Sequence, residues 1–143
     1  MVELRFRYTR IPAPHSEAFP DLAYYSRPII PVVLRHGKAA TRVLALIDSG
    51  ADNTIFSDQL AALLGMNLRR APRDSFCGTS GREQVARYLP VTMQFPGVSY
   101  AAAIGFTRLP LGVAGLLGQV GFFDRFVVTL DQSQGSVVLR HRQ

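Results

Sequence analysis

Apolar residues recur at every second position through much of this chain, and that spacing constrains the fold more than any other feature. Near the start of the sequence, Leu4, Phe6 and Tyr8 alternate with polar residues. Such alternation is typical of a β-strand with one buried face, because successive side chains point to opposite faces. Further strands are expected at 29–34, 41–47, 82–95, 98–106, 126–130 and 136–140. The pattern therefore predicts an all-β domain.

Glycine and proline mark the connections between these strands. The tetrapeptide Arg35-His36-Gly37-Lys38 separates two apolar runs, which indicates a hairpin whose glycine adopts a positive φ. Pro96-Gly97 joins the next long pair of runs. Residues 11–28 hold four prolines and few periodic apolar residues, so we expect an irregular connection there.

One helix is predicted in the middle of the chain. Ser57 or Asp58 can cap its N-terminus, leucines at helical spacing form its buried stripe, and Gly65 ends it. The sequence also allows a short helix around 120–125.

Composition limits the classes of protein to which the chain can belong. Its 143 residues suit one domain, and 48% hydrophobic against 18% charged residues indicates a compact fold. A single cysteine, Cys77, excludes an internal disulfide, and the three histidines are isolated, so no metal or cofactor is expected. No apolar run reaches the roughly 18 residues of a membrane span, and the N-terminus lacks a signal-peptide core. We therefore expect a cytoplasmic protein with no membrane span.

The net charge of +6 comes from scattered arginines. A nucleic-acid interface normally gathers basic residues on one helix or stripe with aromatic residues between them. Here no more than two arginines are adjacent, so a solvated basic surface is favoured and a nucleic-acid partner is disfavoured.

The string Asp48-Ser49-Gly50-Ala51 directly follows the apolar run at 43–47. A carboxylate at the end of a buried strand is unfavourable unless it is paired, hydrogen-bonded or used in chemistry. Peptide hydrolysis by two aspartates that share a proton fits best, and because the chain supplies one such loop, a homodimer would be required. In the alternative interpretation, Asp48 only caps a turn through an Asx hydrogen bond.

A later segment repeats part of this design. An apolar strand ends at Gly115-Leu116-Leu117-Gly118, the chain turns, and a short helix is allowed to follow. Only the first copy carries a carboxylate.

Together these pieces resemble the retropepsins, the single-domain aspartic proteases of retroviruses and their cellular relatives. The resemblance rests on Asp48-Ser49-Gly50-Ala51 with Asp52 behind it, on the glycine-bearing hairpin Phe76-Cys77-Gly78-Thr79-Ser80-Gly81, and on Leu116-Leu117-Gly118. It leads us to divide the chain into an N-terminal strand and irregular extension, 1–26, and a retropepsin-like domain, 27–143.

The resemblance implies a closed all-β barrel with one short helix after the Asp-Ser-Gly loop. It further implies a homodimeric aspartic endopeptidase acting on proteins or peptides without a metal or cofactor. Asp48, Ser49 and Gly50 would form each subunit's share of the catalytic centre. Residues 74–84 would form a flap over the substrate. The residues implied in substrate binding are Ala51, Asp52, Asn53, Gly78, Thr79, Ser80, Gly81, Leu116, Leu117 and Gly118, and pocket walls are also expected at Ile55, Leu109 and Val113.

One position departs from the family pattern. Many members place an arginine after the apolar-apolar-glycine motif, where it pairs with the residue at the Asp52 position, and this chain has Gln119. Arg87, Arg108 or Arg125 could supply the missing cation. The departure also leaves open a catalytically weak or inactive retropepsin-fold module that binds protein or nucleic acid.

Overall fold

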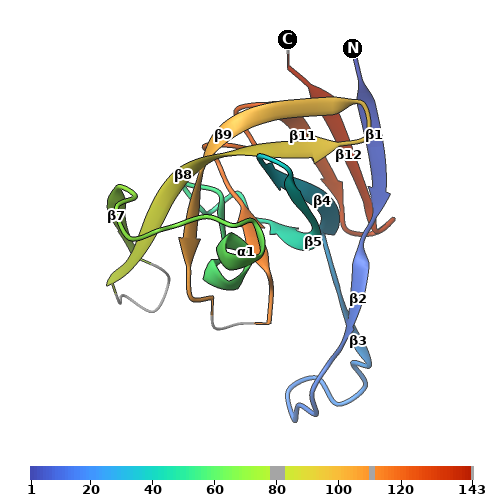
Figure 1. Ribbon diagram of the computed structural model, residues 1–143. Coiled ribbons are helices and arrows are strands. Elements are labelled where there is room, and N and C mark those ends of the chain that lie inside the picture. The colour runs from blue at the N-terminus through green and yellow to red at the C-terminus, as the bar shows by residue number, and fades with distance from the viewer. Residues whose placement is uncertain (78–82, 110–111, 143) are drawn as a thin grey trace.

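Strands make up most of the computed structural model, which describes residues 1–77, 83–109 and 112–142 (Figure 1). The elements in chain order are β1 (Glu3–Arg7), β2 (Thr9–Pro12), β3 (Tyr24–Arg27), β4 (Ile29–His36), β5 (Ala39–Ile47), β6 (Ile55–Ser57), α1 (Asp58–Leu63), β7 (Arg73–Cys77), β8 (Glu83–Phe95), β9 (Val98–Thr107), β10 (Gly115–Leu117), β11 (Phe126–Asp131) and β12 (Ser136–His141). The predicted all-β architecture with one short helix after the Asp-Ser-Gly loop is confirmed.

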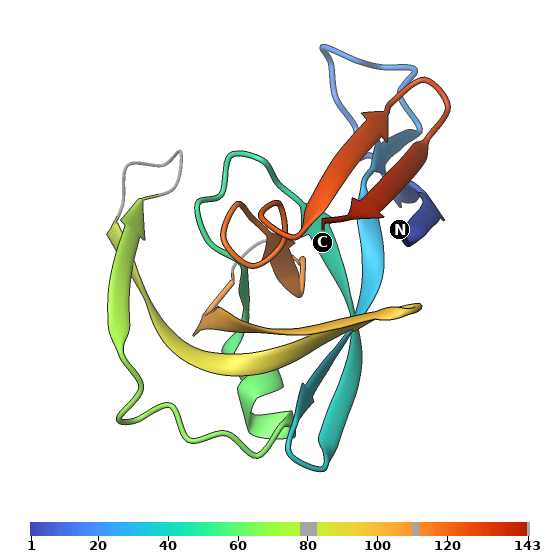
Figure 2. The ribbon, with the colours of Figure 1, turned by 90° about the horizontal axis from the view of Figure 1, so that it is seen from above.

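A seven-stranded sheet forms the body of the molecule (Figure 2). Its strand order is β4-β5-β10-β6-β9-β8-β7. An additional antiparallel pairing joins β4 to β8, with Val33 opposite Gln94, so six of the strands pair in a ring and β7 extends from it. Its interior is apolar because alternate side chains of each strand point inward.

The strongest sequence signals are confirmed in this sheet. β4 and β5 form the predicted hairpin, and Gly37 at the turn has φ +57°. β8 and β9 pair from Arg87 opposite Phe106 to Phe95 opposite Val98, on either side of the Pro96-Gly97 turn.

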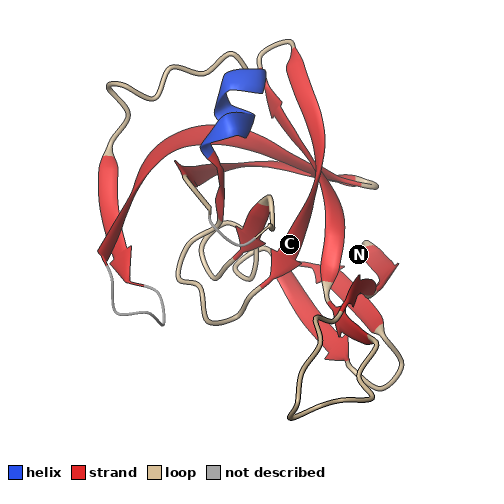
Figure 3. Ribbon diagram, turned by 90° about the horizontal axis from the view of Figure 1, so that it is seen from below, coloured by secondary structure: helices blue, strands red, loops and turns tan. Residues whose placement is uncertain are grey.

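The helix α1 also forms where predicted and packs against β5, β6 and β9 (Figure 3). The Ser57 hydroxyl caps its first turn by accepting from the Gln59 backbone N–H at 3.4 Å. Gly65, just beyond its end, has φ +66°. Ala61 is the buried residue that anchors it to the sheet.

Two further sheets lie beside this body. β1, β12 and β11 form an antiparallel sheet in which Glu3 lies opposite Arg140, so both ends of the chain meet there (Figure 1). β2 and β3 form a two-stranded ribbon that projects from the body (Figure 1). The irregular connection expected at 11–28 was therefore partly wrong. Prolines are tolerated in this ribbon because its strands have free edges.

The short helix allowed at 120–125 was wrong as well. Residues 121–125 form successive turns, and Gly121 has φ +98°, which is incompatible with helical backbone. Phe122 and Phe126 are driven into an aromatic cluster with Phe95 and Tyr100, with the rings of Phe122 and Phe126 5.3 Å apart. Burial of these rings, rather than helix propensity, fixes the turn.

In the part of the chain that the structure describes, no helix has the length and apolar character to span a bilayer. Nor do the described residues bring three or more His, Cys, Asp or Glu side chains together as a metal site would need.

Candidate active site

Asp48 lies at the exact point where β5 leaves the sheet and is half-exposed. Its backbone N–H donates to Leu117 O at 3.0 Å, which ties the start of the loop to β10. Its carboxylate oxygen Oδ1 accepts from the Gly50 N–H at 2.9 Å. This Asx-type bond is the one expected if Asp48 caps a turn, and it also fixes the orientation of the carboxylate. A fixed, accessible carboxylate is compatible with general acid–base chemistry.

The loop after Asp48 is held by backbone hydrogen bonds from the segment after β10. Gln119 N donates to Ala51 O at 2.8 Å, and Val120 N donates to Asp52 O at 2.9 Å. Residues 48–53 and 117–120, which are distant in sequence, therefore lie side by side. The predicted Asp-Ser-Gly-Ala and Leu-Leu-Gly motifs do meet at one place.

Gly118 makes this close approach possible. A Cβ at this position would lie 2.7 Å from Ala51 O and closer still to Asn53 O, well inside van der Waals contact. These are backbone atoms within the hydrogen-bonded loop, so they cannot move aside cheaply. Of the other two residues of the motif, Leu117 is fully buried and Leu116 is half-buried. Their role in substrate binding stays a prediction.

Thr54 is a residue that sequence reasoning missed. Its side chain is fully buried, with 0% exposure. The hydroxyl Oγ1 donates to Val120 O at 2.8 Å and accepts from Gly118 N at 3.2 Å. It thus satisfies a donor and an acceptor where the two segments cross. The sequence did carry a signal for it. Thr54 directly precedes the apolar pair Ile55-Phe56, and a hydroxyl residue beside a buried strand needs hydrogen-bond partners.

Gln119 occupies the position of the expected arginine and makes a different contact. Its amide Nε2 donates to Ser49 O at 2.8 Å, so a neutral side chain supports the loop next to Asp48. Asp52 is exposed. Among the described residues the one ion pair joins Arg5 to Glu3, so no arginine there replaces the familiar partner of Asp52.

Two of the three candidate arginines, Arg87 and Arg125, make contacts elsewhere in the fold. Arg87 Nη1 donates to the carbonyls of Arg69 and Ala71 at 3.2 and 3.0 Å. Arg125 donates to Ala101 O, and its guanidinium lies 4.8 Å from the centre of the Tyr100 ring.

The predicted flap falls on the β7–β8 hairpin, in which Cys77 lies opposite Glu83 (Figure 2). The hairpin is present, but Gly78, Thr79, Ser80 and Gly81 lie outside the described residues. Their contact with substrate therefore stays a prediction.

Tyr88 is a second residue that sequence reasoning missed. In the β8–β9 register Tyr88 is directly opposite Gly105. Its phenolic oxygen is buried, and no described residue offers it a hydrogen bond of good geometry. Burial is the main cause that raises the pKa of Tyr88, the side chain of Asn53 acts to lower it, and the Asp74 carboxylate raises it further.

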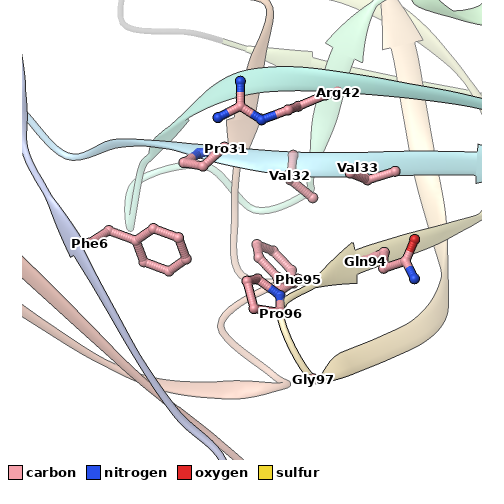
Figure 4. Close-up of a pocket in the computed structure, with 9 residues that line it drawn as sticks. All are labelled: Phe6, Pro31, Val32, Val33, Arg42, Gln94, Phe95, Pro96 and Gly97. Carbon is pink, nitrogen blue, oxygen red and sulfur yellow. The ribbon is translucent and has the colours of Figure 1, made fainter.

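The cavities in the described part of the chain include two outside the Asp48 loop. The larger, about 470 Å³, opens between β1, β4 and the β8–β9 turn (Figure 4). It is lined by Phe6, Pro31, Val32, Val33, Arg42, Gln94, Phe95, Pro96 and Gly97. The other, about 360 Å³, lies beside α1 and is lined in part by Leu109 and Val113, two of the expected pocket residues. Ile55 is instead buried in the core.

Comparison with known proteins bears on this geometry. No protein-family model matches the sequence, and no curated protein matches it either. Solved structures do match. A retropepsin-like aspartic protease from Rickettsia conorii has a TM-score of 0.61 at 13% identity, covering 98% of this chain and 90% of that one. The EIAV protease in complex with the inhibitor HBY-793 has a TM-score of 0.50 at 21% identity, covering 65% of this chain and 82% of that one.

The chain has a retropepsin-like fold. The resemblance inferred from the Asp-Ser-Gly-Ala and Leu-Leu-Gly motifs is thereby confirmed at the level of architecture. At 13% and 21% identity the likeness establishes the fold alone. The chemistry depends on the residues of the Asp48 loop itself.

Proposed function

We propose that this protein is an aspartic endopeptidase that acts as a homodimer on protein or peptide substrates. The observation that carries the proposal is the placement of Asp48. Its half-exposed carboxylate sits on a turn whose backbone is hydrogen-bonded to residues 117–120, within a retropepsin-like fold. A site of this kind holds a reacting group in a fixed orientation at little cost during the reaction.

In the proposed reaction, one Asp48 from each subunit contacts a shared water. Two carboxylates a few Å apart cannot both be ionised, so the pair retains one proton and titrates as a unit. The ionised member removes a proton from the water, which attacks the peptide carbonyl. The protonated member hydrogen-bonds the carbonyl oxygen and donates its proton as negative charge develops there. No metal or covalent intermediate is required.

The dimer is part of the proposal because each chain supplies one Asp-Ser-Gly turn. Ser49 and Gly50, both exposed, would face the second copy and the peptide backbone. Ala51, Asp52 and Asn53 would form one wall of the cleft, and the β7–β8 hairpin would cover it. β1 and β11 are the edge strands of the three-stranded sheet, and an open strand edge favours a two-fold contact between copies.

A binding module without turnover is the second candidate. It is favoured by Gln119, which leaves Asp52 without the usual arginine among the described residues, and by the turn-capping bond of the Asp48 carboxylate. Such a protein would keep the fold and bind peptides in the same cleft without cleaving them.

Digestion of casein and of a peptide library at several pH values separates the two candidates. Asp48→Asn removes the ionisable group while retaining its shape, and we expect it to lower cleavage by at least about 100-fold. Asp21→Asn, the same change at an exposed residue of the β2–β3 ribbon, is the matched control and should leave cleavage unchanged.

Co-purified mixed dimers test the requirement for two copies. A dimer with one wild-type and one Asp48→Asn subunit should be inactive if each subunit supplies one carboxylate. Full activity in the mixed dimer, or in Asp48→Asn itself, would refute the mechanism.

A further inference from the structure

Tyr88 lies opposite a glycine for a physical reason. A Cβ on Gly105 would come within 2.8 Å of Tyr88 Cε1 and 2.9 Å of Cζ, so the phenol ring lies flat against the bare backbone of β9. A cross-strand tyrosine–glycine pair of this kind directs the ring across the neighbouring strand instead of outward. On its other side Gly105 pairs with Ile55, and its N–H donates to Thr54 O at 3.0 Å, so the ring lies across β9 on the side of the segment that follows the Asp48 turn.

The phenolic oxygen ends in a costly position. Oη is buried, and among the described residues it has no hydrogen-bond partner of good geometry. A buried hydroxyl without a partner has lost its hydration with nothing in return, so such groups in native structures usually have a specific role. Two polar side chains affect the pKa of this phenol: Asn53, in the wall of the proposed cleft, lowers it, and the Asp74 carboxylate raises it.

Asn53 has a fixed backbone and a less constrained side chain. Its backbone forms a bridge with Val120, and its carbonyl lies against Gly118. The residue as a whole is half-buried, so part of it is accessible from the proposed cleft. The orientation of that amide decides whether the loop presents a donor or an acceptor.

We propose that Tyr88 is a positioning residue that holds the side-chain amide of Asn53 and so sets which polar group the cleft wall presents to a peptide. In the proposed arrangement an N–H of the Asn53 side-chain amide points to the phenolic oxygen, an orientation that agrees with the lowering effect of Asn53 on the pKa of Tyr88. The Asn53 carbonyl oxygen is then directed to the cleft as an acceptor. The neighbouring subsite would favour peptides that offer an N–H or O–H donor there.

This inference deepens the proposed protease function and rests on it, so the decisive variants must separate the two. Tyr88→Phe removes only the hydroxyl and keeps the ring against Gly105. We expect it to lower kcat/KM by about three- to tenfold, mainly through KM, on peptides with a donor at this subsite. Tyr24→Phe, the same change on an exposed tyrosine of the β2–β3 ribbon, should have no effect.

A double-mutant cycle tests whether Tyr88 acts through Asn53. In an Asn53→Ala background, Tyr88→Phe should change kcat/KM by less than about 1.5-fold, since the amide it positions is gone. If the two effects instead add in full, Tyr88 does not act through Asn53 and the proposal is wrong.

A titration that needs no turnover provides the second measurement. The pKa of the Tyr88 phenol can be followed by NMR of ¹³C-labelled tyrosine, with its signal assigned by its loss in Tyr88→Phe. Asn53→Ala should raise that pKa, because the contact that lowers it has been removed. An unchanged pKa overturns the contact whether or not the protein cleaves peptides. Absence of cleavage by the wild-type protein, together with the expected pKa change, would refute the protease function and leave the contact standing.

Discussion

The turns that follow β5 and β10 begin alike and end differently. Each comes after an apolar strand and contains a glycine, at Gly50 in the first and Gly118 in the second. The first turn, residues 48–54, leaves Asp48 half-exposed and Ser49 and Gly50 exposed. The second turn, residues 118–125, leads directly into the buried aromatic cluster around Phe122.

This difference suggests a division of function between the two similar turns. The second turn supplies the backbone donors and the Gln119 amide that hold the first turn in place. The first turn carries the carboxylate. If this is right, changes in the second turn should act mainly on folding and changes in the first mainly on chemistry.

The strongest challenge to this division is Gly118→Ala. The added methyl group would overlap the Ala51 and Asn53 carbonyls, and neither can shift without breaking loop hydrogen bonds. We expect a loss of about 3 kcal/mol or more in unfolding free energy, or failure to fold, measured by urea denaturation.

Gly50→Ala is its counterpart in the first turn. There a Cβ would be 3.3 Å from Asp48 Oδ1, a side-chain atom. We expect a small loss of stability and a large loss of cleavage. Equal losses of stability in both variants would contradict the division.

Thr54→Val should have the next largest effect. It keeps the shape of the side chain but leaves Gly118 N and Val120 O without the Thr54 hydroxyl. The expected cost is about 2 kcal/mol in unfolding free energy. Thr54→Ser keeps the hydroxyl, so the same denaturation measurement should show most of the stability retained.

Tyr100→Phe probes the buried end of the second turn, where the Tyr100 hydroxyl donates to Gly121 O at 2.8 Å. The loss at neutral pH should be about 1 kcal/mol. Burial raises the pKa of Tyr100 well above its usual value, against the lowering effect of Arg125 and with a further rise from Asp124.

Because the pKa of Tyr100 is raised in the folded protein, the free energy of unfolding should decrease at alkaline pH. The folded protein keeps a proton that the unfolded chain releases, so this contribution to stability is complete below about pH 10. It is lost as the pH rises from there toward the elevated pKa of Tyr100. Unfolding free energies measured from pH 8 upward should therefore fall less steeply in Tyr100→Phe than in the wild type. Parallel slopes would show that Tyr100 ionises freely in the folded state.

Gln119→Ala should have the smallest effect on stability. Its hydrogen bond to Ser49 O is exposed, so we expect a loss of about 0.5 kcal/mol. Cleavage should nevertheless fall a few-fold, because the turn next to Asp48 loses a support. A stability loss as large as that of Thr54→Val would mean that Gln119 belongs to the folding machinery rather than to the site.

Much of the fold could be predicted because strand periodicity and turn residues agree locally. The β4–β5 hairpin and the Ser57-capped helix follow from patterns within a few residues. The segments that were mispredicted depend on distant contacts. The β2–β3 ribbon needs pairing across the loop between Pro12 and Tyr24, and the turns at 121–125 are set by aromatic packing.

The candidate site divides in the same way. Asp48 and Gly118 could be singled out from the sequence because each stands in a short, unusual motif, and their roles in catalysis and substrate binding stay predictions. Thr54 and Tyr88 could not be singled out in this way. Thr54 matters because its hydroxyl donates to the Val120 carbonyl, and Tyr88 because the Asn53 side chain affects its pKa, and only the folded chain brings these groups together. The hydrogen bond from Gln119 to Ser49 O could not be predicted from the sequence either, because the sequence shows only that an expected arginine is replaced.

β1 pairs with β12 within a single chain, and the His141 N–H donates to Val2 O at 3.0 Å. Each subunit thus forms this three-stranded sheet from its own strands. Because these strands pair within one chain, we expect a subunit released from the proposed dimer to keep its secondary structure. Dilution would then abolish activity by separating the two subunits, at protein concentrations where each subunit is still folded.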